Sequence, residues 1–187
     1  MKKDGIGGSN TATGICFQKL ARNKIREALK TSLPDLIANA TFCENGHFYE
    51  FIGEKYHLQN DWWNEYISRK ILPDDALYVT SSNTMFIFEY KCQKGGGSTD
   101  KKILTCAFEK SQYEKLLHPF DIKKVEYILI LNKWFNPRYN PIYKDYINYI
   151  IQCKCHYFFP LDEDLEKLEP TEFQKLLKLI STSCLEP

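Results

Sequence analysis

The chain has 187 residues, of which 43% are hydrophobic and 26% charged, and this composition excludes a largely disordered protein. Its length suits one α/β domain, so we predict a single domain over residues 1–187. The chain has 25 Lys and Arg and 24 Asp and Glu, which gives a net charge of +1. This charge excludes a strongly basic field that would hold nucleic acid unaided.

The first predicted element is a helix over residues 14–31, after a flexible glycine-rich opening at residues 5–10. Apolar residues repeat there at helical spacing, at Phe17, Ala21, Ile25, Ala28 and Leu29. The helix should stop at Leu33-Pro34, because proline lacks the N–H that a continuing helix needs. Residues 47–58 are rich in β-favouring aromatic and branched side chains, which predicts a first strand or bent hairpin.

The middle of the chain contains the clearest pattern. Residues 61–70 predict a short helix or loop with two tryptophans, Trp62 and Trp63. We favour packing of these tryptophans on the core over their forming a surface for a partner. Two apolar runs, residues 76–79 and 85–92, are joined by the turn-rich residues 80–84, which predicts a β-hairpin. Residues 95–99 predict a mobile glycine-rich loop.

The later elements complete a mixed α/β pattern. We predict a helix over 107–117, a strand buried on both faces over 125–131, and a closing helix, strand and helix. Those last three elements are expected over residues 142–151, 155–159 and 171–180.

The cysteines and the hydropathy bear on the cellular compartment. Seven irregularly spaced cysteines without an apolar leader predict a reducing cytoplasm, and no run approaches the roughly 20 apolar residues of a membrane span. A structural zinc site could use Cys153, Cys155 and His156 as ligands, but the sequence has no second ligand pair at a suitable spacing. We therefore favour buried thiols over a zinc site.

One acidic-x-Lys tripeptide stands out among the three in the chain. Glu89-Tyr90-Lys91 alone lies in a hydrophobic strand, where Glu89 and Lys91 share a face with Met85 and Ile87. Burying a carboxylate and an ammonium there is costly unless they pair or bind an ion. Folding the hairpin about Ser82 and Asn83 puts Asp74 opposite Lys91, and a slip of a residue or two still leaves Asp74 at the same end of the sheet.

Two carboxylates and one amine at one place suit phosphodiester hydrolysis. Asp74 and Glu89 would supply hard oxygen ligands to Mg²⁺, and Lys91 would orient the attacking water or stabilise charge on the phosphorus. The alternative is structural: Asp74 caps a turn after Pro73, and Glu89 and Lys91 form a surface pair on an edge strand.

The pattern Pro73-Asp74, fourteen residues, then Glu89-Tyr90-Lys91 resembles the PD-(D/E)xK nuclease superfamily. The resemblance implies an α/β restriction-endonuclease-like fold, with an αβββαβ core at about residues 14–131, a central mixed sheet flanked by helices, and a C-terminal helix–strand–helix extension. It implies that Asp74, Glu89 and Lys91 are catalytic and that Asp74 and Glu89 bind the metal. Relatives often have Glu where this chain has Gln18, which puts a metal-linked role for Gln18 in doubt.

The opening residues 13–18 and the glycine-rich loop after Lys91 are also similar to type IIS restriction enzymes. With its small size and neutral charge, the chain resembles the small, cleaving subunit of a heterodimeric bacterial type IIS restriction endonuclease. That implies an endodeoxyribonuclease that cuts one strand of double-stranded DNA beside a larger recognition subunit.

Two alternatives remain open. One is a self-sufficient homodimeric nuclease of the same fold. The other is a non-catalytic protein-interaction module, dominated by exposed aromatic residues near Trp62, Trp134 and Tyr139.

Overall fold

The structure is a computed structural model that describes residues 7–44, 47–95, 99–162 and 171–185, without the side chains of residues 7–11. It is a mixed α/β fold built on one five-stranded sheet with the strand order β1-β2-β3-β4-β5. The strands are β1 (Ala40–Cys43), β2 (Asp75–Val79), β3 (Thr84–Lys91), β4 (Lys124–Leu131) and β5 (His156–Phe158). The pairs β1–β2 and β2–β3 are antiparallel, whereas the pairs β3–β4 and β4–β5 are parallel.

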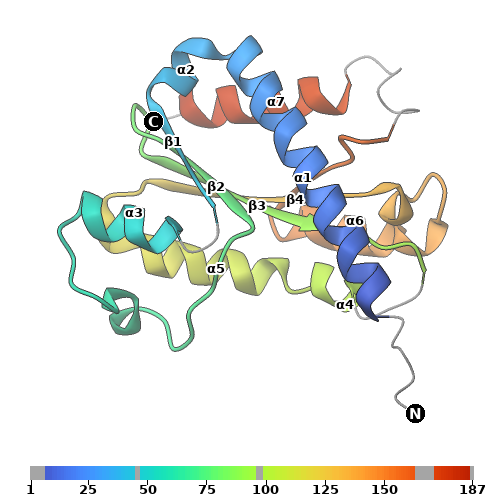
Figure 1. Cartoon of the computed structure of the whole chain (residues 1–187), viewed down its shortest axis with the longest axis horizontal. Coiled ribbons are helices and arrows are strands. Elements are labelled where there is room, and N and C mark those ends of the chain that lie inside the picture. Colours follow the sequence, from blue (N-terminus) through green and yellow to red (C-terminus); the bar gives the residue numbers. More distant parts are fainter. Residues whose placement is uncertain (1–6, 45–46, 96–98, 163–170, 186–187) are drawn as a thin grey trace.

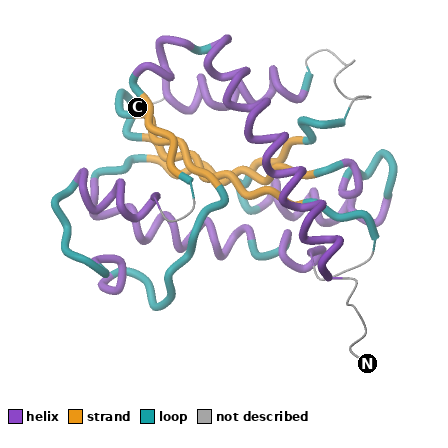
Figure 2. Tube along the Cα trace, viewed as in Figure 1, coloured by secondary structure: helices purple, strands orange, loops and turns teal. Residues whose placement is uncertain are grey.

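Helices cover both faces of the sheet (Figures 1 and 2). The longer helices are α1 (Gly7–Ser32), α3 (His47–Lys55), α5 (Cys106–Leu117), α6 (Lys144–Gln152) and α7 (Glu172–Leu185). The shorter elements are α2 (Pro34–Ala38), α4 (Thr99–Ile103), η1 (Trp62–Glu65), η2 (His118–Phe120), η3 (Lys133–Phe135) and η4 (Pro141–Tyr143). None of the described helices has both the length and the apolar character that a membrane span requires.

Alternation along the central strands makes two cores, one on each face. Met85 and Ile87 of β3 pack with α3, α5 and α6, while Phe86 and Phe88 pack with α1 and α7. All five residues of β2 are buried, as are seven of the eight residues of β3. The hairpin therefore lies inside the sheet, with β3 between β2 and β4, and the edge-strand alternative for Glu89 and Lys91 is wrong.

Several expected elements are confirmed with small shifts of their ends. The hairpin, the helix at 107–117, the strand at 125–131 and the three closing elements all form close to the predicted residues. The first helix begins at Gly7, seven residues before the predicted start, so residues 7–10 of the expected flexible opening are helical. Residues 5 and 6 and residues 96–98 of the expected mobile loop lie outside the described residues.

The predicted strand at residues 47–58 is wrong, because His47–Lys55 forms helix α3. Phe48, Tyr49 and Ile52 are buried while Glu50 and Glu54 are exposed, and this one-sided spacing is helical. Aromatic β-propensity was outweighed by tertiary packing. The first strand is instead β1, a four-residue strand antiparallel to β2.

The hairpin register also differs from the predicted one, by two residues. Val79 pairs with Thr84 and Asp75 pairs with Phe88, so the turn is centred between Ser81 and Ser82. A shift of two residues preserves the facing of every side chain, since alternation along a strand has a period of two. The side chains of Asp74, Glu89 and Lys91 therefore stay on the predicted face.

Candidate active site

The structure brings Asp74, Glu89 and Lys91 together at the end of the β2–β3 hairpin. Lys91 Nζ lies 2.7 Å from Glu89 Oε2 and 4.0 Å from Asp74 Oδ2. The side chains are 9% exposed for Glu89, 15% for Lys91 and 30% for Asp74, so Asp74 is the member most open to solvent. The predicted convergence of two carboxylates and one amine is confirmed as geometry.

Backbone contacts hold Asp74 just before β2. Its Oδ2 accepts a hydrogen bond of 2.9 Å from the backbone N–H of Tyr90 in β3. Its main-chain oxygen accepts one of 2.7 Å from Arg22 Nη2 of α1. Asp74 is thus fixed from the neighbouring strand and from the helix on the opposite face of the sheet.

Protonation at the site follows from burial and from the neighbouring charges. The pKa of Glu89 is raised to about 7, chiefly by burial; Lys91 acts against this rise, and the Asp74 carboxylate adds to it. Burial would lower the pKa of Lys91, but the charges of Glu89 and Asp74 outweigh it and raise that pKa. Two like charges close together therefore favour a cation or a proton between them.

The carboxylate oxygens of the site are possible ligands for a divalent ion. In the part of the chain that the structure describes, no group of three or more His, Cys, Asp or Glu side chains is placed to hold a metal. Asp74 Oδ1 and Glu89 Oε1 accept no hydrogen bond from any described residue, so each carboxylate offers one oxygen. Mg²⁺ commonly takes one or two protein carboxylates and completes its shell with water and substrate phosphate, which fits this pair.

A third acid lies near the pair but is already engaged. The charge of Glu109 on α5 contributes to the raised pKa of Glu89. Its Oε1 accepts a bond of 2.8 Å from Thr105, and its Oε2 accepts a bond from the Tyr127 hydroxyl. The arrangement leaves Asp74 and Glu89 as the carboxylates open to an ion.

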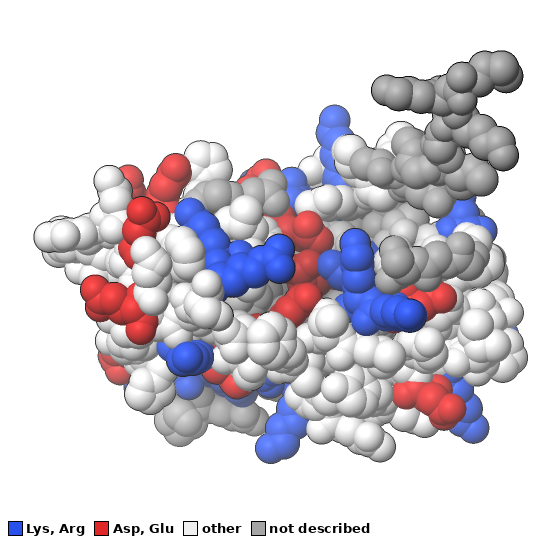
Figure 3. All heavy atoms as spheres, turned by 90° about the horizontal axis from the view of Figure 1, so that it is seen from below, with Lys and Arg blue, Asp and Glu red and all other residues white. Residues whose placement is uncertain are grey.

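A cavity of about 600 Å³ opens beside Glu89, between α5 and the segment that leads into β2. Arg69, Lys70 and the exposed side chains of Leu72 and Phe108 line it. Figure 3 views the α5 side of the molecule, where acidic atoms near the middle of the face lie between two groups of basic side chains. A polyanion that crosses this face would meet cations on both sides of these acidic atoms.

An ion network on the opposite face of the sheet was not predicted. Arg22 and Arg26 of α1 both bind Asp75 and Glu44, at distances from 2.7 to 3.2 Å. The Asp75 side chain is 3% exposed, and burial raises its pKa against the effect of the two arginines. The available signal was the i,i+4 spacing of Arg22 and Arg26 on a helix whose buried residues include Ile25.

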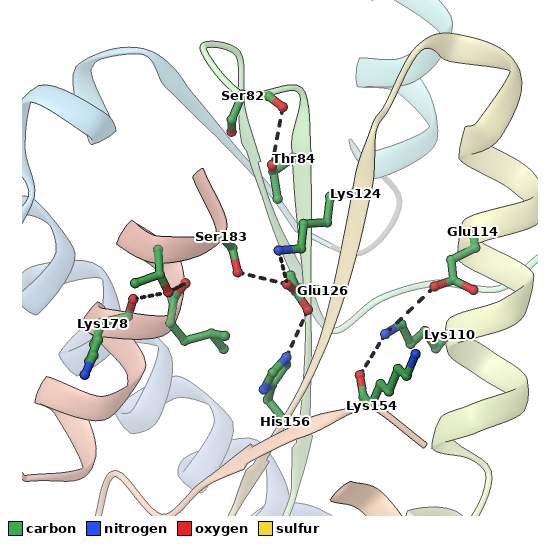
Figure 4. Close-up of polar contacts among 12 residues, drawn as sticks. Ser82, Thr84, Lys110, Glu114, Lys124, Glu126, Lys154, His156, Lys178 and Ser183 are labelled. Carbon is green, nitrogen blue, oxygen red and sulfur yellow. Dashed lines mark hydrogen bonds and ion pairs between the residues drawn. The ribbon is translucent and has the colours of Figure 1, made fainter. Parts of the chain in front are cut away.

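A second polar cluster lies on the α7 face, nearer the amino end of β4 (Figure 4). Glu126 accepts bonds from Ser183 at 2.8 Å and pairs with His156 at 2.9 Å and Lys124 at 3.2 Å. Burial would raise the pKa of Glu126, but these partners lower it to about 2. The carboxylate is fully partnered, so the cluster ties β4 to β5 and α7.

The other residues that the sequence analysis singled out lie away from the candidate site or have structural contacts. His156 pairs with Glu126, while Cys153 is half-buried and Cys155 is buried, and these three residues are not part of any potential metal-ligand group found among the described residues. Trp62 is 8% exposed and packs in the core, as predicted, which removes it from any exposed aromatic surface. Gln18 is partly buried on α1.

Comparisons with known proteins found no match to the chain. No protein family, no curated protein and no solved structure matches it. The case for a function therefore comes from the chemistry of the site.

Proposed function

We propose that this protein is a magnesium-dependent endonuclease of the PD-(D/E)xK type that cuts one strand of duplex DNA. The observation that carries the proposal is the meeting of Asp74, Glu89 and Lys91, with Lys91 Nζ within 4.0 Å of both carboxylates. The element order α1-β1-β2-β3-α5-β4 supports it, since it agrees with the αβββαβ core of that superfamily once the additional helices α2, α3 and α4 are set aside.

Each residue of the site has a role in phosphodiester hydrolysis. Asp74 and Glu89 would hold Mg²⁺ through their unpartnered oxygens, and the bound ion would polarise the phosphoryl group and supply an activated water. The Lys91 ammonium is held by Glu89, so it can orient a water or stabilise negative charge that grows on the phosphorus. Burial of Glu89 and Lys91 strengthens these interactions, because water screens them poorly.

We further propose that the chain acts with a larger DNA-recognising subunit, as the small subunit of a type IIS restriction endonuclease does. One site per chain cuts one strand, so a double-strand break needs a second site. The net charge of +1 supports a partner that provides much of the grip on DNA. A self-sufficient homodimer is the competing arrangement.

The test is nicking of supercoiled plasmid with Mg²⁺, run with and without the co-encoded larger protein. Wild-type chain should nick in the presence of Mg²⁺ and the partner, and Asp74→Asn and Lys91→Ala should lose at least about a hundredfold in rate. The matched controls are Asp121→Asn and Lys123→Ala at the two exposed positions of the Asp121-Ile122-Lys123 tripeptide, and both should retain activity. Full cleavage by either site variant would refute the assignment.

A further inference from the structure

A hollow of about 520 Å³ lies where β3 and β4 leave the sheet, directly beyond the candidate active site. It begins two residues after Lys91, and its lining includes Gln93, Asn132, Trp134 and Tyr139. Its volume is within the range of small-ligand sites.

The strand exits that form this hollow are fixed by paired hydrogen bonds. Asn132 Oδ1 accepts from the Gln93 backbone N–H at 3.1 Å, and Asn132 Nδ2 donates to the Gln93 carbonyl at 2.8 Å. The backbone N–H of Asn132 also donates to the Lys91 carbonyl at 3.2 Å. The hollow therefore keeps a fixed position relative to the catalytic lysine of the proposed site.

Gln93 has a buried oxygen that no described residue satisfies. The residue is 8% exposed, and its side-chain Nε2 donates to the Gly95 carbonyl, which orients the amide. Its Oε1 then has no hydrogen-bond partner in the described part of the chain. A buried carbonyl without a donor is unfavourable, so this oxygen points to a ligand that brings an N–H group.

The rest of the lining suits a nucleotide. Tyr139 is 37% exposed, and Lys133 Nζ lies 4.4 Å from the centroid of its ring. The exposed part of this ring and half-buried Trp134 form the aromatic part of the lining, on which a base can pack. Lys94 and Lys133 also line the hollow, and its lining includes no Asp or Glu among the described residues. The aromatic surface suits the base of a nucleotide, the Gln93 amide suits an exocyclic amine of that base, and the lysines suit its phosphate.

We propose that this hollow binds one nucleotide of the substrate strand next to the scissile phosphate, with the base against Tyr139 and Trp134 and its exocyclic amine donating to Gln93 Oε1. Lys94 contacts the phosphate of that nucleotide. The proposal rests on the proposed nuclease function and adds a base preference to it. Adenine and cytosine carry an exocyclic amine where thymine has a carbonyl, so the hollow favours the first two.

The experiment is an NMR titration of the full ¹⁵N-labelled chain without divalent ions, using dAMP, dCMP and dTMP as probes. The chain has three tryptophans, and a Trp134→Phe spectrum identifies the Trp134 indole signal. We expect dAMP and dCMP to shift this signal with affinities roughly fivefold higher than that of dTMP. Gln93→Met should abolish that preference, while the control Gln152→Met, at an exposed position of α6, should retain it.

A second variant covers the case in which Gln93→Met does not fold. Lys94 is exposed, so Lys94→Ala should fold and should lose the tighter binding of dAMP over deoxyadenosine that the wild type shows. Equal affinities for the three nucleotides, no shift of the Trp134 signal, or a preference unchanged in Gln93→Met would each overturn the proposal.

The outcomes separate this inference from the nuclease assignment. A nucleotide preference in a chain that fails to nick plasmid with its partner would refute the nuclease and retain the hollow as a nucleotide site. Nicking that depends on Lys91, in a chain whose hollow ignores nucleotides, would retain the nuclease and refute the subsite.

Discussion

Arg22 of α1 connects one face of the sheet to the candidate site on the other face. Arg22 makes contacts from one guanidinium to Glu44, Asp75 and the main chain of Asp74. Its side chain is 15% exposed, so these contacts are shielded from water. A residue on α1 thereby fixes the backbone that carries a carboxylate of the candidate site.

Replacing Arg22 with Met should leave buried Asp75 short of a cation. We expect the free energy of unfolding to fall by about 3 kcal/mol or more, because removing one partner of a buried ion pair leaves an uncompensated charge. Urea denaturation measures it, with Lys19→Met at an exposed position of the same helix as the control. A loss no larger than that of the control would contradict the role given to Arg22.

Glu126 should make the protein sensitive to acid. Its pKa of about 2 in the folded chain lies below the ordinary value of 4.5, so the charged form favours folding. The contribution is present above about pH 5 and is lost as the pH falls toward 2, with an upper bound of about 3 kcal/mol. Glu126→Gln should be less stable at neutral pH and should show a flatter stability profile between pH 5 and 2, measured by urea denaturation at each pH.

At the scale of elements, the central hairpin was predictable and the helix α3 was not. Residues 76–79 and 85–92 are apolar runs joined by turn residues, and burial on both faces agrees with that pattern. Residues 48, 49 and 52 carry aromatic and branched side chains that favour strands locally, and only the packing partners of α3 decide for a helix. Propensity fails where side chains far apart in sequence determine burial.

The candidate site was predictable for a similar reason. Side chains alternate between the two faces of a strand, so a two-residue error in register leaves each side chain on the same face. The face on which Asp74, Glu89 and Lys91 lie could therefore be predicted from the sequence. The partners of the site could not be, because Arg22 lies 52 residues before Asp74 and Asn132 lies 39 residues after Gln93. Long-range side-chain contacts leave no periodic signal.

The Asn132 clamp between the ends of β3 and β4 allows a test at this scale. Asn132→Leu removes both hydrogen bonds to the Gln93 backbone and should lower the free energy of unfolding by roughly 2 kcal/mol. Asn132→Asp keeps the acceptor and should lose about half as much. Thermal unfolding measures both variants, and Asn148→Leu, at an exposed position of α6, is the control. A series in which Asp is as damaging as Leu would argue against the clamp.

The whole molecule has a nearly balanced charge, and on the face in Figure 3 the acidic atoms near the middle lie between basic groups. Such a surface positions a polyanion without binding it strongly, because affinity for DNA grows with the number of phosphates neutralised. That balance is the physical reason for proposing a partner subunit.

The isolated chain should accordingly be a monomer that binds DNA weakly at physiological salt and nicks plasmid slowly. Sedimentation velocity measures the first property, and an electrophoretic shift with a duplex oligonucleotide measures the second. A stable dimer with tight DNA binding would favour the self-sufficient homodimer over the two-subunit arrangement.

The central claim is that Asp74 and Glu89 bind one divalent ion beside Lys91, and Mn²⁺ binding followed by electron paramagnetic resonance tests it most directly. The wild-type chain should take up one Mn²⁺, and the double variant with Asp74→Asn and Glu89→Gln should bind it roughly tenfold more weakly or worse. Asp121→Asn should bind like the wild type. Equal Mn²⁺ affinity in the double variant and the wild type would contradict the account.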